Sequence, residues 1–199
     1  MARYFDKFPK MMSLKDGKVI TNLLIRVGVI KDIQHLTVIY YPYNIQEGDT
    51  PELIASKFYD DAEKHWVVTI LNDIYDPYYD WPMTYQQFVA YIDDKYGSQA
   101  AASSQIHHYE KIVASTDSYT GQTTTNTYTI DLNSYTNLIT STVSKTFPNG
   151  QSVTVDTSKR AVDMFTYELE LNESKRSIKL LKQDYINQIQ SELETLLVA

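Results

Sequence analysis

Hydrophobic and polar positions along this chain follow two periods, which predict strands in some segments and helices in others. Residues 1–42 read as an extended interaction segment with a turn at Asp16-Gly17, and 22–33 fits helix or strand equally well. Apolar residues on both faces of 36–45 indicate a strand covered on both sides, which Pro42 restricts to a sheet edge or bulge. Alternation over 165–171 predicts a further half-exposed strand.

Two short helices forming one hairpin are predicted just after the first strand. Thr50 is a suitable N-cap, and Pro51 suits the first helical position because its missing N–H has no partner there anyway. Asn72 is expected to end the second helix in a left-handed conformation. The face expected to be buried in the first helix consists of Leu53, Ile54 and Phe58.

A third helix is predicted between Thr84 and Gly97, and a polar region follows it. Thr84 and Gln87 have the spacing of a capping box, and Gly97 suits a helix stop. The composition then turns to Ser, Thr, Gln and Asn, so 115–127 is expected to be a mobile loop. Further on, Gly150 predicts a tight turn that sets Val143 opposite Val155, with one face inward.

The chain ends in a predicted amphipathic helix, which begins near Asp184 and could pack on its own core or in another chain's groove. The fold class expected from these elements is α+β. It would combine a βααβ unit, an adjoining helix, a mixed or antiparallel sheet and the C-terminal helix. We divide the chain into an N-terminal extended segment, a central helical domain, a Ser/Thr-rich loop and β-hairpin region, and a C-terminal strand and helix: 1–42, 43–97, 98–160 and 161–199.

Composition excludes several classes of function. The 199 residues carry a net charge of −7, which argues against nucleic acid as a partner because that affinity depends on clustered Lys and Arg. No apolar run is long enough for a membrane span, and the first residues lack the apolar core of a signal peptide. The absence of cysteine removes thiolate chemistry and disulfides. An excess of tyrosine, 17 against 6 glycines, is typical of interaction surfaces.

The sequence lacks the local motifs of common enzymes and metal sites. With six glycines it has no phosphate-binding or dinucleotide-binding glycine pattern, and its four histidines have no metal-ligand spacing. Asp73, Asp76 and Asp80 lie in a tyrosine-rich stretch where turn formation accounts for them better than calcium binding or glycoside hydrolysis. We therefore expect a non-enzymatic binding or structural protein with no cofactor and no metal. An enzyme of another class stays open, since catalytic residues need not form local motifs.

The part of the chain that begins at Tyr43 and extends through Asn72 resembles the LysM module. Its pattern of an aromatic strand, Gly-Asp-Thr, Ile-Ala and a later Asn is met by Gly48, Asp49, Thr50, Ile54, Ala55, Phe58 and Asn72. This resemblance implies a βααβ unit in which Ile54, Ala55 and Phe58 pack inward. Pro51 departs from the pattern, and no Gly-x-x-Leu-x-Ile-Pro closing strand follows Asn72.

Two further runs, 65–81 and 172–181, resemble the LysM-bearing baseplate wedge proteins of T-even-type contractile-tailed phages. The first contains the unusual Tyr75-Asp76-Pro77-Tyr78-Tyr79-Asp80-Trp81. The resemblance implies a non-catalytic virion protein of the tail baseplate, assembled in the host cytoplasm. Its partners would be other wedge, hub and tail proteins, and several copies would join neighbouring wedges into a ring around the hub. No resemblance covers about 100–160.

Exposed aromatic side chains would serve as anchors in such a joint, surrounded by a polar rim. The candidates for partner contact are Tyr78, Tyr79, Trp81 and Tyr85. The plainer interpretation, that such rings fill the protein's own core, is equally compatible with the sequence. The alternative function is glycan binding of the LysM type, to peptidoglycan or chitin.

Overall fold

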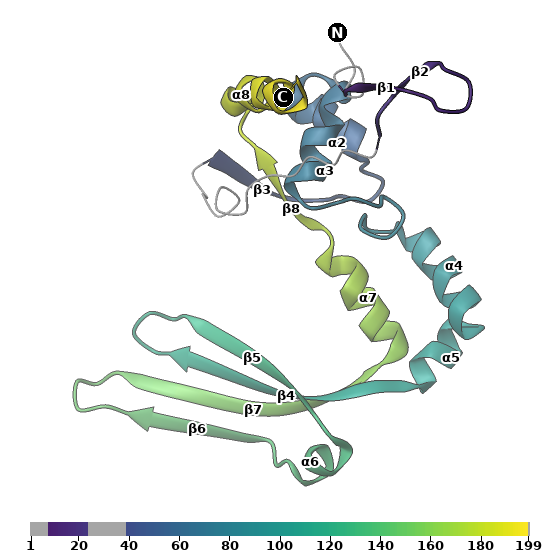
Figure 1. Ribbon diagram of the computed structural model, residues 1–199. Helices are drawn as coiled ribbons and strands as arrows, with labels where there is room; N and C mark the ends of the chain where they lie inside the picture. The colour runs from purple at the N-terminus through teal and green to yellow at the C-terminus, as the bar shows by residue number, and fades with distance from the viewer. Residues whose placement is uncertain (1–7, 24–38, 199) are drawn as a thin grey trace. The chain divides into compact units, whose positions relative to one another are not determined.

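The computed structural model describes residues 8–23 and 39–198 (Figure 1). The chain forms two compact units, the first from residues 1–84 and 172–199 and the second from residues 85–171. Helices and antiparallel sheets together make the chain α+β, as the sequence predicts. The division of the chain into four segments at 42, 97 and 160 remains a prediction. In the described residues, no helix combines the length and apolarity needed to cross a bilayer.

The first unit is built around a strand, two helices and a distant closing strand. Strand β3 pairs antiparallel with β8, in a register that runs from Tyr40 opposite Leu181 to Asn44 opposite Ser177. The helices lie between these strands in sequence and share one hydrophobic core with them. The bounds are β3 Tyr40–Asn44, α2 Pro51–Tyr59, the 3-10 helix η3 Ala62–Lys64, α3 His65–Leu71 and β8 Ser177–Leu181.

Helix α2 begins as predicted but buries a different face. The Thr50 hydroxyl accepts the Leu53 N–H at 3.3 Å, and Pro51 occupies the first turn. Leu53 and Phe58, expected to be buried, are 48% and 38% exposed. The buried residues are Ile54, Ala55 and Tyr59. The inward stripe is thus rotated by one residue, and the Phe58 ring packs edge-on against the Tyr43 ring at 5.2 Å.

Other expectations for the first unit are partly met. Strands β1 Lys10–Met12 and β2 Val19–Thr21 form a hairpin around the predicted turn, where Gly17 has a φ of +65°. In β3, Tyr40 is buried but Tyr41 is exposed, so the strand is covered on one side only. Two predicted segments are only partly described. Residues 24–33 of the segment 22–33 and residues 36–38 of the segment 36–45 lie outside the described part of the chain.

Two further features of the first unit are the end of α3 and the C-terminal helix. The residue with positive φ after α3 is Asp73, at +54°, and not Asn72 as predicted. The C-terminal helix α8, Ile186–Val198, follows the 3-10 helix η4, Gln183–Tyr185. Helix α8 packs on its own chain, since Ile186 and Leu193 are buried.

The second unit holds a four-stranded antiparallel sheet of order β5-β4-β7-β6 (Figure 1). Residues 115–127, expected to be a mobile loop, instead form the ends of two long strands and the tight turn between them. Threonine side chains such as Thr116 and Thr123 face each other across these strands and favour the extended form. The bounds are α4 Tyr85–Tyr96, α5 Gln99–Ser104, β4 Ile106–Asp117, β5 Thr123–Ile130, α6 Leu132–Asn137, β6 Ser141–Thr146 and β7 Ser152–Asp163.

The hairpin of β6 and β7 has the predicted register, with Val143 opposite Val155 and Gly150 at a φ of +81°. The predicted inward face is wrong for β6, because every residue of this strand is exposed. The predicted helix ending at Gly97 is α4, in which Phe88 and Ile92 are buried.

The strand predicted over 165–171 is wrong, because this segment forms helix α7, Met164–Ser174. The Asp163 carboxylate accepts the Thr166 N–H at 2.8 Å and so caps the helix start. The buried polar residues Glu168 and Asn172 lie four positions apart, on one side of the helix. Because polar side chains occupy part of the buried face, the apolar residues alone give a false period of two.

Candidate functional site

Residues 73–81, here called the tyrosine loop, follow α3 in the first unit. The Asp80 carboxylate accepts the N–H groups of Tyr75 at 3.0 Å and Asp76 at 2.9 Å. Asp76 in turn accepts the Tyr78 N–H at 2.9 Å. These backbone hydrogen bonds lower the pKa of Asp80. The loop therefore has a defined shape, set by carboxylates that form turns, as the sequence predicts.

The tyrosine loop presents its aromatic rings to solvent. Tyr78 is 89% exposed and Tyr79 is 75% exposed. The backbone beneath them is tied down, because the Tyr79 carbonyl accepts a hydrogen bond from the Lys175 ammonium. The Tyr75 hydroxyl donates to Asp73 at 3.1 Å. Large apolar rings on an ordered backbone bind a partner with little loss of conformational entropy.

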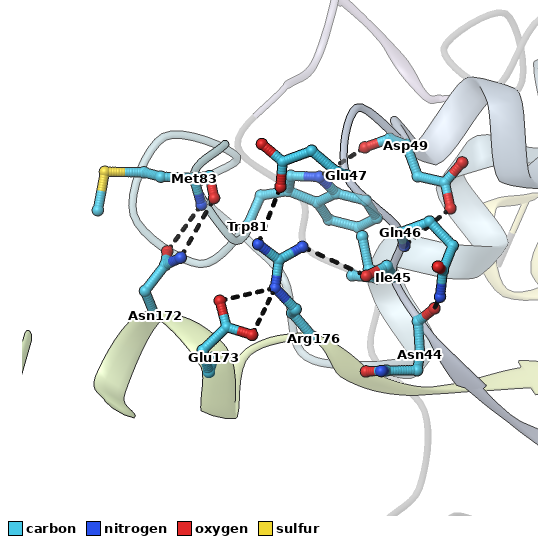
Figure 2. Close-up of polar contacts among 10 residues, drawn as sticks. All are labelled: Asn44, Ile45, Gln46, Glu47, Asp49, Trp81, Met83, Asn172, Glu173 and Arg176. Atoms are coloured by element: carbon cyan, nitrogen blue, oxygen red, sulfur yellow. Dashed lines mark hydrogen bonds and ion pairs between the residues drawn. The ribbon is translucent and has the colours of Figure 1, made fainter. Parts of the chain in front are cut away.

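The other two predicted contact residues have different surroundings. The Trp81 indole N–H donates to the Asp49 carbonyl at 3.0 Å, and the ring packs against the core of the first unit (Figure 2). Trp81 is therefore tied to its own fold. Tyr85 begins α4 in the second unit and is 60% exposed. Partner contact by Trp81 and Tyr85 remains a prediction.

The Gly-Asp-Thr stretch sets the start of α2 through a buried carboxylate. Gly48 has a φ of +82°, which favours glycine. Asp49 is only 8% exposed and accepts hydrogen bonds from the Tyr43 hydroxyl at 2.6 Å, the Gln46 N–H at 3.0 Å and the Lys57 ammonium at 2.7 Å. Burial alone would raise the pKa of Asp49, but these donors outweigh it and lower the pKa. Burial, followed by this carboxylate, raises the pKa of Tyr43 to about 12.

Asn72, the last residue of the LysM-like pattern, ties α3 to the closing strand. Its amide nitrogen donates to the carbonyls of Val68 at 2.8 Å and Lys179 at 2.9 Å. Its amide oxygen accepts the Lys179 N–H at 2.8 Å. The partner strand that the sequence around Asn72 lacks is thus β8, which enters from a segment about 100 residues later.

Arg176 connects the start of this closing strand to the end of β3 through hydrogen bonds and ion pairs (Figure 2). Its guanidinium donates to the Glu173 carboxylate at 2.8 Å, the Ile45 carbonyl at 3.3 Å and the Glu47 carboxylate at 3.1 Å. Asn172 makes a second connection, because its side chain accepts the Met83 N–H at 2.8 Å and donates to the Met83 carbonyl at 3.2 Å. Neither residue has a role that the sequence pattern predicts, although both lie in the run 172–181 that carries the resemblance.

A groove of about 460 Å³ opens beside the tyrosine loop. It lies between the first turn of α2, helix α3 and the loop, and both apolar and polar side chains line it. In the described part of the chain, no cluster of three or more acidic or histidine side chains could hold a metal ion. The lining residues are Thr50, Pro51, Glu52, His65, Thr69, Ile74, Tyr75, Pro77 and Trp81.

The second unit contains a buried charge cluster that the sequence analysis missed. Glu168 on α7 is 7% exposed and accepts hydrogen bonds from the Lys95 ammonium at 2.6 Å, the Tyr96 hydroxyl at 2.9 Å and the Tyr91 hydroxyl at 3.3 Å. Burial opposes ionisation, but these donors lower the pKa of Glu168. The hydrophobic pattern gives no sign of this cluster, because Glu168 lies in 165–171, where the apolar residues show a false period of two.

Acid is expected to destabilise the second unit from about pH 4.5, the ordinary pKa of a glutamate, downward. Glu168 has a lowered pKa in the folded state, so its stabilisation is present above pH 4.5 and is lost as the pH falls through the folded-state pKa. Thermal unfolding between pH 7 and pH 3 measures this. In Glu168→Gln the acid-induced loss should shrink, whereas Asp93→Asn, at an exposed carboxylate on α4, should leave it unchanged. Equal acid sensitivity in all three proteins would contradict the assignment.

Comparison with known proteins decides the family. Residues 29–196 match the family described as base plate wedge protein 53. The chain belongs to this family. Baseplate wedge protein gp53 of Enterobacteria phage T4 is 29% identical over 157 residues, covering 76% of this chain and 70% of the relative. As a member of the wedge protein 53 family, the chain is a structural component of a phage baseplate wedge. Neither match names a glycan-binding protein, so nothing supports the glycan alternative.

Proposed function

We propose that this chain joins neighbouring baseplate wedges into a closed ring around the central hub, without catalysing a reaction. Membership of the base plate wedge protein 53 family supports a place in the tail baseplate of the virion. Assembly would take place in the host cytoplasm, with other wedge, hub and tail proteins as partners. A ring of identical joints needs heterologous contacts, in which two different surfaces of each joint meet two neighbours.

The observation that carries this proposal is the exposure of Tyr78 and Tyr79 on an ordered loop. Tyrosine is enriched among the residues that dominate binding energy at interfaces. The carboxylates of Asp73 and Asp76 beside these rings are exposed, so the loop suits a partner segment with Lys or Arg next to apolar groups. The adjoining groove enlarges the apolar surface that such a segment would cover.

The proposal includes a LysM-like unit that acts as a protein joint. Its support is the order β3-α2-α3-β8 with antiparallel outer strands, together with the bridging amide of Asn72. Gly48 and Thr50 support it further, through the positive φ and the N-cap that begin α2. In this arrangement everything between α3 and β8 would be inserted into one small unit.

Quantitative mass spectrometry of purified baseplates tests the proposed function. We expect the chain in every preparation, at one fixed number of copies per wedge. Chemical cross-links from Lys175, which contacts the backbone of the tyrosine loop, should reach a protein of a neighbouring wedge. A chain that is missing from baseplates, or whose cross-links all stay within one wedge, would contradict the proposal.

A further inference from the structure

The four-stranded sheet of the second unit has two chemically different faces. Val143 lies opposite Val155, and Val155 lies opposite Ser115. Side chains alternate along each strand, so the odd-numbered residues of β4, β6 and β7 share one face. On the opposite face, most residues from Arg160 toward the turn between β6 and β7 are Thr or Ser. The first face, here called the valine face, carries Val113, Val143, Val153 and Val155 together with Lys111, Lys145 and Lys159.

The valine face is only partly covered, since Val143 is exposed and Val113, Val153 and Val155 are half-buried. Val143 is 62% exposed, and no residue of β5 or β6 is buried. Helix α6 covers only one end of the face, where the Tyr135 ring lies 4.6 Å from the Tyr109 ring. A sheet normally buries its apolar face against a second layer. The described residues supply no such layer over the valines at the other end.

The charge on this face is positive although the chain as a whole is negative. Among the described residues, no carboxylate pairs with Lys111 or Lys145, and Lys159 donates to the Tyr135 carbonyl at 2.7 Å. The Asp117 carboxylate at the edge of the face is already occupied, accepting the Tyr119 N–H at 2.7 Å and the Gln151 amide at 2.7 Å. The face therefore combines an apolar stripe with unneutralised lysines.

We propose that the valine face binds an acidic amphipathic helix of another baseplate protein; this rests on the proposed function for its setting. The valines span three neighbouring strands, about 10 Å, which matches the diameter of a helix. The rows from Lys111 to Asp117 extend roughly 20 Å, or three to four helical turns. Asp and Glu beside the apolar stripe of the helix would pair with the lysines.

Two other occupants fit less well. A second copy of the sheet would bring its own lysines to the lysines of this face, and like charges across an interface oppose association. Helix α8 of a second copy is acidic, but its apolar residues Ile186 and Leu193 are buried in its own unit. The partner is therefore a different protein.

Two neighbouring positions on β6 give a matched pair of variants. Val143→Glu adds a negative charge to the valine face, and Ser144→Glu adds the same charge to the opposite face of the same exposed strand. We expect Val143→Glu to lower incorporation into baseplates at least tenfold relative to Ser144→Glu, with equal thermal stability of the two purified chains. Equal incorporation would overturn the proposal.

The direct test places the photo-crosslinking residue benzoylphenylalanine at position 143 or 144 of the full chain in purified baseplates. Position 143 should cross-link at least tenfold more than position 144, to a peptide with Asp or Glu beside a helical apolar stripe. Equal yields, or links only to a copy of this chain, a basic segment or nucleic acid, overturn the inference while leaving the proposed function intact. If neither benzoylphenylalanine variant is found in baseplates, the inference and the proposed function are both refuted.

Discussion

Replacing Tyr78 and Tyr79 together by alanine is expected to lower incorporation of the chain into baseplates at least tenfold. Both rings are exposed in the isolated chain, so their loss should leave its folding unchanged. Each aromatic anchor at an interface is worth on the order of 2 kcal/mol, so the pair exceeds the 1.4 kcal/mol that corresponds to tenfold binding. Quantitative mass spectrometry of purified baseplates gives the incorporation, and thermal unfolding gives the stability.

A tyrosine elsewhere on the surface provides the control for this double variant. Tyr119 is 85% exposed in the turn between β4 and β5, far in sequence from the tyrosine loop. Tyr119→Ala removes a similar exposed ring and should be incorporated normally. If the double variant enters baseplates as well as Tyr119→Ala does, the tyrosine loop is not a contact surface.

Asn172→Asp is expected to destabilise the first unit by about 3 kcal/mol at pH 7. The Asn172 side chain is 3% exposed and pairs with both backbone groups of Met83. A carboxylate would still accept the Met83 N–H but would face the Met83 carbonyl without a donor, and a buried unpaired charge is costly. Urea unfolding followed by circular dichroism measures the free energy.

The pH dependence identifies the cause of this loss. Facing a carbonyl in a buried place, the new carboxyl should have a raised pKa in the folded state. Its penalty is then complete above that pKa and shrinks as the pH falls towards the unfolded value, because the protonated acid can donate to Met83. The difference between wild type and Asn172→Asp should therefore be smaller at pH 5 than at pH 7, whereas Asn172→Ala should lose the same amount at both. A pH-independent difference would exclude charge burial.

Local sequence rules predicted that α2 and α3 form and where α2 begins, but not the buried face of α2, the end of α3 or the sheet. Thr50 and Pro51 predict the start of α2, because helix capping depends on residues that are neighbours in sequence. The strand that completes the unit, β8, lies far away in sequence, and no local pattern near Asn72 could reveal it. The run 172–181 carries a resemblance to the family, but that resemblance does not predict that the segment pairs with β3.

The errors in the second unit have a common physical origin. Polar residues occupy positions that sequence reasoning reserves for apolar ones: Glu168 is buried in α7, and threonines fill the strands of an open sheet. Hydrophobic periodicity fails where a buried face is polar and where a sheet leaves apolar residues uncovered. The tyrosine loop could be recognised because its residues are unusual, but their exposure follows only from the fold.

Wedge assembly in the presence and absence of the chain tests the central claim most directly. Wedges purified from cells that lack this chain would be mixed with hub, with or without the purified full chain, and closed rings counted by electron microscopy. The proposed joint predicts closed rings only when the chain is added, and few or none with the Tyr78→Ala, Tyr79→Ala variant. Rings that close equally well without the chain would contradict its role as the joint between wedges.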